Sequence, residues 1–142
     1  MLLVAGNRTT PQSVLAQLAS EDDPDLLVQI AENENTHPLT LAYLSRHNEP
    51  AVRAAVARNA NVPFEVIWTL KDDCDSDVRM TLASKLNAPA DVLLALREDD
   101  NPQVSSRARL TLDRFYAKYR TCNEHISMMD CAKFAWRRSE AV

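Results

Sequence analysis

The chain has 142 residues, of which 46% are hydrophobic and 25% are charged, and its formal net charge is −4. This length fits one ordinary domain, and the composition is typical of a globular protein and excludes a disordered one. No apolar run approaches membrane-spanning length, and the apolar start MLLVAG is too short for a secretory signal, so we expect a cytoplasmic protein.

Glycine, cysteine and the distribution of charge exclude further classes. Gly6 is the only glycine, so the chain has no glycine-rich phosphate loop, and its turns must be made by Asn, Asp and Pro. The three cysteines, Cys74, Cys122 and Cys131, are too few and too dispersed for a disulfide framework. Residues 1–102 carry a net charge of −8 and residues 103–142 carry +4, which disfavours nucleic acid as a partner of the main body.

A period of 26 residues begins at Pro11. Pro63 and Pro89 follow Pro11 at multiples of this period, and His37, with Pro38 beside it, stands at the remaining place. Alignment at this period needs no gap and gives four units, namely 11–36, 37–62, 63–88 and 89–114.

Each unit has the pattern of a short helix, a polar turn and a longer helix. The short helix has an aliphatic i, i+3 pair, such as Leu15 and Leu18, which is typical of one buried helix edge. The turn ends on Asp23, Glu49, Asp75 or Asn101, three of which are good N-caps, and Pro or Ser follows as the first residue of the second helix. No segment keeps a period of two, so we predict no sheet.

The units predict an all-α protein of the α-solenoid type. One helix pair cannot bury its apolar face alone, whereas stacked pairs form a continuous core. We expect residues 1–10 to be a thin N-terminal cap and residues 115–142 to be a basic, helical C-terminal cap.

The turn and second helix carry a pattern that resembles a known family. The pattern is present in DDPDLLVQIAENENTHP (22–38), NEPAVRAAVARNANVP (48–63) and DSDVRMTLASKLNAP (75–89), and it resembles the leucine-rich variant repeat, a relative of the HEAT repeats, over about residues 10–112. The resemblance implies a right-handed superhelix in which the second helices are α-helical and the first are short or partly 3₁₀. One member of the family carries an iron–sulfur cluster on an N-terminal group of cysteines, but no cysteine precedes Cys74 here, so we expect no cofactor.

Two columns of the alignment contain side chains of the kind that bind ligands. Arg53 and Arg79 share one column, and they either form a structural ladder with carboxylates such as Asp75, Asp77 or Glu49, or line a groove that holds an anionic ligand. The asparagines recur after the second helices, where we expect them to close the helix in the left-handed conformation and to form the inter-unit turns: Asn33, Asn35, Asn59, Asn61 and Asn87.

Metal binding and catalysis are not favoured. The acidic runs SEDDPD, KDDCDSD and REDDN lack the ligand spacing and the glycine of a calcium loop, and they recur where helix N-caps belong. Cys122, His125 and Cys131 supply three ligands, whereas a structural zinc site needs four. Cys74 lies in a carboxylate-rich turn that disfavours the thiolate of a nucleophile, so we predict no catalytic residue.

The sequence favours a non-enzymatic helical-repeat scaffold that binds a protein partner on its concave surface. The candidate contacts lie on the second helices and are Arg53, Arg58, Arg79 and Ser84. Tyr43, Phe64 and Trp68 lie outside the leucine columns, and they would form a protein-binding hot spot if they were exposed together. The alternative is a nucleic-acid-binding or DNA-repair protein similar to the HEAT-type DNA glycosylases, which would need a basic groove and a catalytic carboxylate.

Overall fold

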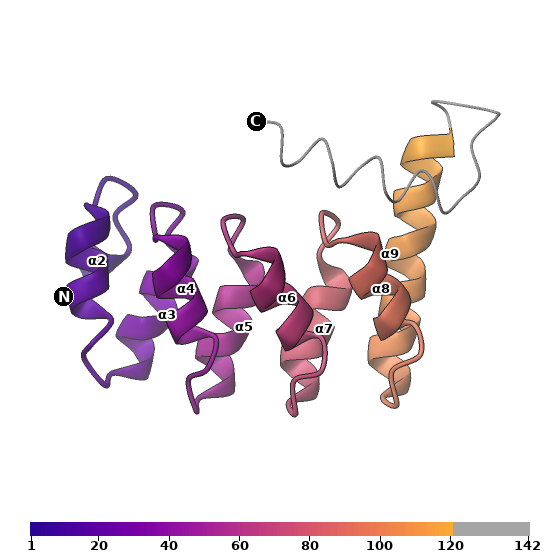
Figure 1. Cartoon of the computed structure of the whole chain (residues 1–142), viewed down its shortest axis with the longest axis horizontal. Helices are drawn as coiled ribbons and strands as arrows, with labels where there is room; N and C mark the ends of the chain where they lie inside the picture. Colours follow the sequence, from indigo (N-terminus) through magenta and orange to yellow (C-terminus); the bar gives the residue numbers. More distant parts are fainter. Residues whose placement is uncertain (121–142) are drawn as a thin grey trace. The chain divides into compact units, whose positions relative to one another are not determined.

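A computed structural model describes residues 1–120, and every regular element among these residues is an α-helix (Figure 1). The first helices of the pairs have seven residues each and are α2 (Gln12–Leu18), α4 (Pro38–Leu44), α6 (Phe64–Leu70) and α8 (Ala90–Leu96). The second helices are α3 (Pro24–Glu32), α5 (Pro50–Arg58), α7 (Ser76–Ser84) and α9 (Pro102–Arg120), and a short α1 (Leu2–Ala5) precedes them all. The all-α prediction is confirmed, and the first helices are short but α-helical, not 3₁₀.

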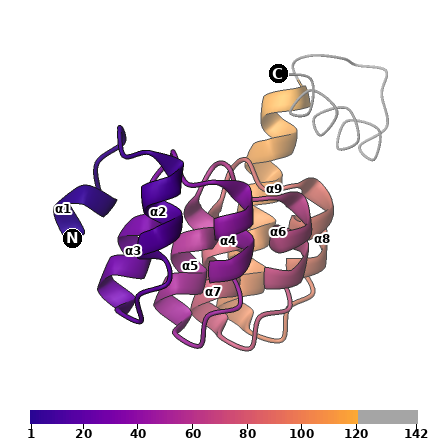
Figure 2. The same ribbon diagram turned by 60° about the vertical axis from the view of Figure 1, so that its left-hand side comes forward.

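The chain divides into two compact units, one from Met1 to Leu82 and one that starts at Ala83. In repeat proteins each helix pair contacts only its neighbours, so such a chain has no single global core. In the first unit, α2, α4 and α6 form one layer, and α3 and α5 pack against each other in a second layer (Figures 1 and 2). In the second unit, α8 packs against α9.

The aliphatic columns of the sequence form the cores of these units. In the first unit the aliphatic residues at the fifth and eighth positions of each 26-residue unit are at most 7% exposed. The aliphatic residues of the second helices are equally buried: Leu26, Ile30, Val52, Val56, Val78 and Leu82. In the second unit, Ala88, Leu93 and Leu112 form a buried cluster that Leu94 and Tyr116 partly cover. Within residues 1–120, no helix combines the length and the apolar character that a membrane crossing requires.

Side-chain caps begin three of the four second helices. Asp23 accepts a hydrogen bond from the N–H of Asp25 at 3.1 Å, Asp75 accepts one from Asp77 at 2.8 Å, and Asn101 accepts one from Gln103 at 2.9 Å. Glu49 makes no such bond, because its longer side chain is a poor N-cap. The prediction of three good N-caps in this column is therefore confirmed.

The asparagines that follow the second helices work differently from what the sequence predicts. Asn33 and Asn59 have φ values of −69° and −60°, and no residue among those described has a positive φ, so the left-handed prediction is wrong. Instead, the amide Nδ2 of Asn59 donates to the carbonyls of Ala31 at 2.7 Å and Asn33 at 2.9 Å, one repeat earlier. Since the side chain satisfies these helix-end carbonyls, the backbone can continue in an extended conformation into the next pair.

The first ten residues have the form of half a repeat. Asn33 Nδ2 donates to the carbonyls of Ala5 at 2.7 Å and Asn7 at 2.8 Å, in the same way as Asn59 does one period later. The short α1 also packs against α3, and Ala5 is completely buried, as are Ala31 and Ala57. The segment expected as a thin N-terminal cap thus has the contacts that the C-terminal end of a second helix makes in the later units. Of the C-terminal cap expected at 115–142, residues 115–120 continue α9, and the remainder lies outside the described residues.

Candidate functional site

Arg53 is a buried structural residue. Its Nε and Nη2 atoms each donate to one carboxylate oxygen of Asp73 at 2.8 Å, and Nη1 donates to the carbonyls of His47 at 2.8 Å and Asn48 at 2.9 Å. The last donor meets the sulfur of Cys74 at 3.7 Å. These contacts account for all five N–H groups of the guanidinium, so Arg53 has no donor left for a ligand.

The ion pair joins helix α5 of one unit, which carries Arg53, to the turn of the next unit, which carries Asp73. Asp73 also accepts the N–H of Asp75 at 2.9 Å, which fixes its carboxylate under the guanidinium. The expected carboxylates were Asp75, Asp77 and Glu49, but Asp75 is occupied in capping α7. The structure therefore favours the ladder interpretation for Arg53, with Asp73 as the partner that sequence reasoning missed.

The ion pair determines the charge state of both groups. The side chains of Arg53 and Asp73 are 10% and 7% exposed. Burial raises the pKa of the Asp73 carboxyl, but the hydrogen bonds from Arg53 and from the Asp75 N–H outweigh it, and the pKa lies below its usual value of 3.8. The hydrogen bond with Asp73 likewise raises the pKa of Arg53, so the pair is fully ionised at neutral pH.

The other three candidate residues lie in different environments. Arg79 is partly buried, and its Nη1 donates to the carbonyl of Asp73 at 2.6 Å. Arg58 forms an ion pair with Glu32 at 2.9 Å, with the two side chains 51% and 42% exposed. Ser84 is exposed at the end of α7. Partner binding stays a prediction for these three residues, and the structure leaves Arg53 without a donor for it.

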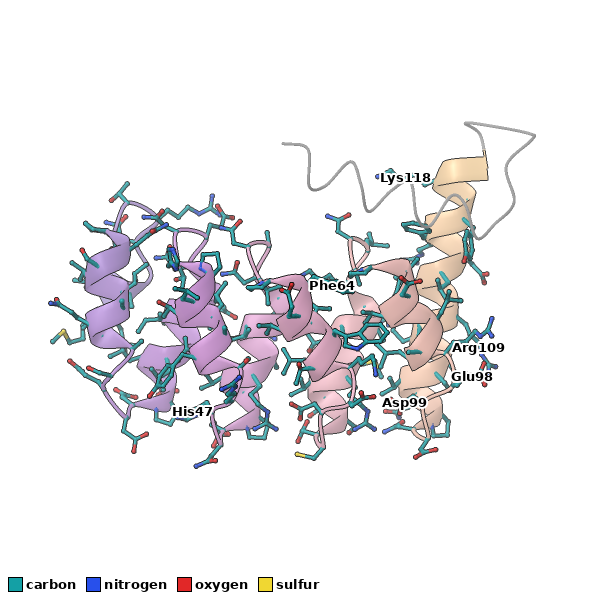
Figure 3. All side chains as sticks on the ribbon, in the orientation of Figure 1. His47, Phe64, Glu98, Asp99, Arg109 and Lys118 are labelled. Atoms are coloured by element: carbon teal, nitrogen blue, oxygen red, sulfur yellow. The ribbon has the colours of Figure 1, made fainter. Side chains whose placement is uncertain are left out.

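An open cavity of about 440 Å³ lies beside the Arg53–Asp73 pair, and its lining consists of Arg46, His47, Asn48, Pro50, Arg53, Cys74 and Asp75. His47 lies at the edge of the molecule where the turns between paired helices are (Figure 3), and its Nδ1 accepts the N–H of Glu49 at 3.1 Å. The Cys74 sulfur lies 3.7 Å from Nη2 of Arg53 and 3.8 Å from Oδ1 of Asp73, a carboxylate that is already held in the ion pair with Arg53.

Within residues 1–120, no three His, Cys, Asp or Glu side chains are grouped so that they could hold a metal ion. The weak Cys122, His125 and Cys131 set lies outside the described residues. The acidic turns instead cap helices and pair with Arg53.

Large apolar side chains are exposed on the layer of first helices. On α4, Leu39 and Tyr43 are 74% and 66% exposed and stand four residues apart. On α6, Trp68 is 44% exposed, and its ring lies 5.9 Å from that of Phe64, at the start of the helix (Figure 3). The ammonium of Lys71 lies 4.7 Å from the centre of the Trp68 ring. Tyr43 is thus largely exposed, whereas Trp68 is about half exposed and Phe64 is partly buried. We call Leu39, Tyr43, Phe64 and Trp68 the aromatic face.

Lys85 occupies the column that contains Asn33 and Asn59. It is partly buried, and desolvation by burial lowers its pKa from 10.5 to about 8. Because burial disfavours the charged form, a protonated Lys85 lowers the free energy of unfolding of the protein.

We expect the stability of the wild type, relative to a Lys85→Met variant, to rise by about 1–2 kcal/mol between pH 8 and pH 10.5. The folded-state pKa is the lower one, so the unfolded chain holds more protons in this window and folding gains as the pH rises. The full shift would correspond to a larger change, but solvent screens a partly buried ammonium. Urea titrations of both proteins across this pH range measure the difference, and a difference independent of pH would contradict the effect.

One comparison with known proteins identifies a repeat family. Residues 2–60 match the family model of the Leucine Rich Repeat Variant domain, so this segment, which contains α1 to α5, is a leucine-rich variant repeat region. The predicted resemblance is confirmed for this segment. The match includes α1, which agrees with the observation that the first ten residues have the form of half a repeat. No curated protein and no solved structure matches the chain.

Proposed function

We propose that this protein is a non-enzymatic, cytoplasmic helical-repeat scaffold that binds a protein partner. The observation that carries the proposal is the exposure of Tyr43 at 66% and Trp68 at 44% on neighbouring first helices. Tyr and Trp are enriched among residues that dominate binding energy, and exposed apolar patches on repeat proteins mark interaction surfaces. The match to a helical repeat family supports a scaffold.

Two surfaces are candidates for partner binding, namely the second helices and the aromatic face. The sequence places the contacts on a concave surface along the second helices, where Arg58, Arg79 and Ser84 stay candidates. However, Val52 to Ala57 of α5 are all buried, so this helix offers the partner little besides Ala51 and Arg58. The aromatic face offers more apolar area, and it is therefore the primary surface in this proposal.

Site-specific photo-crosslinking in living cells tests the proposal. We expect a photoreactive phenylalanine at position 43 to give one defined protein adduct and the same residue at position 86 to give none. Leu86 is 56% exposed, so it is a control of similar exposure outside the aromatic face. Position 51 on α5 tests the second helices.

Two crosslinking results would contradict the proposal. Adducts from position 51 alone would move the partner to the second helices and overturn the aromatic face. Adducts to nucleic acid from position 43 would replace the protein partner with the alternative function. Substituting Trp68 by Ala should reduce the adduct from position 43 at least about tenfold, since hot-spot residues carry most of the affinity.

A further inference from the structure

The exposed row of α3 carries an acidic, aliphatic, acidic pattern. Asp25 and Glu32 are exposed and Val28 between them is partly exposed, and the spacing i, i+3, i+7 places all three on one side of the helix. The remaining side of α3 is buried through Leu26, Leu27, Ile30 and Ala31. The α3 row, as we call Asp25, Val28 and Glu32, is thus the centre of the solvent-facing side.

The surroundings of the α3 row are acidic. The first unit contains twelve acidic and six basic residues. Four of the six cations already pair with carboxylates of the same unit, through Arg8, Arg53, Arg58 and Lys71. Asp25 has no cation partner among the described residues, and Glu32 shares only a half-exposed pair with Arg58. The row therefore favours a basic ligand with an apolar centre.

The helix α9 carries the complementary pattern with the same spacing. Arg107, Leu110 and Arg114 are all exposed at i, i+3, i+7, with Leu110 55% exposed, and we call them the α9 row. Neither arginine has an ion-pair partner among the described residues. The helix α9 has five basic residues and one acidic residue, Asp113. Arg109, four residues before Asp113, balances its formal charge.

We propose that the α9 row of one molecule binds the α3 row of a second copy. In both rows the outer charged residues stand seven positions apart, about 10 Å along the helix at roughly 1.5 Å per residue, so two opposite-charge pairs can form at once. Leu110 then covers Val28 between the two pairs. The contact joins two different surfaces, so it is heterologous and propagates from head to tail.

The size of the contact sets its strength. One helix against one helix buries less than the roughly 1,200 Å² of a stable interface, so the association is weak. Its charges remain near solvent, and salt therefore screens them. We expect reversible, concentration-dependent association that weakens as salt increases.

Sedimentation velocity of the full-length protein tests this contact. The expected result is a weight-average sedimentation coefficient that rises between 10 and 500 µM protein (about the range for a weak interface) and an association constant at least about tenfold lower in 500 mM than in 50 mM NaCl. A wild-type protein that stays monomeric over this range in 50 mM NaCl would overturn the proposal.

Charge reversal makes the test specific. The Asp25→Lys/Glu32→Lys and Arg107→Glu/Arg114→Glu variants should each be monomeric, because each then has two rows of like charge. An equimolar mixture of the two should associate again, because each variant now complements the other. The single variants Asp22→Lys and Arg109→Glu reverse exposed charges outside the rows and should associate as the wild type does.

If association returns when the two variants are mixed, its loss in each variant alone was not caused by misfolding, since two misfolded chains do not regain a specific association. Helical content by circular dichroism should be the same for all variants. Failure of two folded variants to associate on mixing would overturn the proposal. The test needs only the purified chain and uses surfaces other than the aromatic face, so its failure leaves the proposed partner binding intact.

Discussion

Replacing Arg53 by Ala lowers the free energy of unfolding by about 3–5 kcal/mol, which makes it one of the two largest effects that we expect. The substitution leaves the Asp73 carboxylate, 7% exposed, without its cation. It also removes the donor to the carbonyls of His47 and Asn48, which the guanidinium bonds at 2.8 and 2.9 Å. Urea-induced unfolding followed by circular dichroism measures the change.

The Arg58–Glu32 pair is a matched control for this prediction. It joins the same kinds of groups at 2.9 Å, but its side chains are about half exposed. Arg58→Ala should therefore cost only about 0–1 kcal/mol, because solvent screens an exposed pair. Equal costs for Arg53→Ala and Arg58→Ala would contradict the structural role of Arg53.

Acid unfolding gives a second measure of the same pair. The folded-state pKa of Asp73 lies below its usual value of 3.8, so the folded state holds the proton less tightly than the unfolded state. The stabilisation is present above pH 3.8 and is lost as the pH falls through the folded-state pKa. An Asp73→Asn variant should lack this acid-dependent loss while being less stable at pH 7.

The sequence predicts those features of this fold that depend on local pattern. Leu15 and Leu18, and the caps Asp23 and Asp75, act within a few residues of their positions, so their columns are enough to place the helices. A repeat also supplies the same local signal several times, which strengthens each assignment.

Features that depend on contacts between successive units were predicted less well. The partner of Arg53 stands twenty residues later, in the turn of the next unit, while other carboxylates such as Asp75 and Glu49 were equally plausible from sequence. One signal was present, since an acidic residue follows both Arg53 and Arg79 at this spacing, Asp73 and Asp99. The 66% exposure of Tyr43 could not be predicted, because it depends on how closely neighbouring helices approach.

Replacing Asn59 by Ala lowers the free energy of unfolding by about 2–4 kcal/mol, the second large effect. Asn59 is 4% exposed, its amide donates to Ala31 and Asn33, and its Oδ1 accepts the N–H of Asn61 at 2.7 Å. The substitution leaves these backbone groups, which join one repeat to the next, without partners. Thermal and urea unfolding measure the loss.

Two further variants identify the amide donor as the cause. Asn59→Asp keeps the shape and the acceptor for Asn61, but it places a carboxylate against two carbonyl oxygens, so it should be at least as destabilising as Asn59→Ala at pH 7. Lowering the pH to about 4 should recover part of this loss, because a protonated carboxyl can donate one of the two hydrogen bonds. The Nδ2 of Asn61 also donates to a carbonyl one repeat earlier, that of Glu34, but this side chain is exposed, so Asn61→Ala should cost less than about 1 kcal/mol. If Asn59→Ala cost no more than Asn61→Ala, the buried amide of Asn59 would not be what stabilises the stacking of α3 on α5.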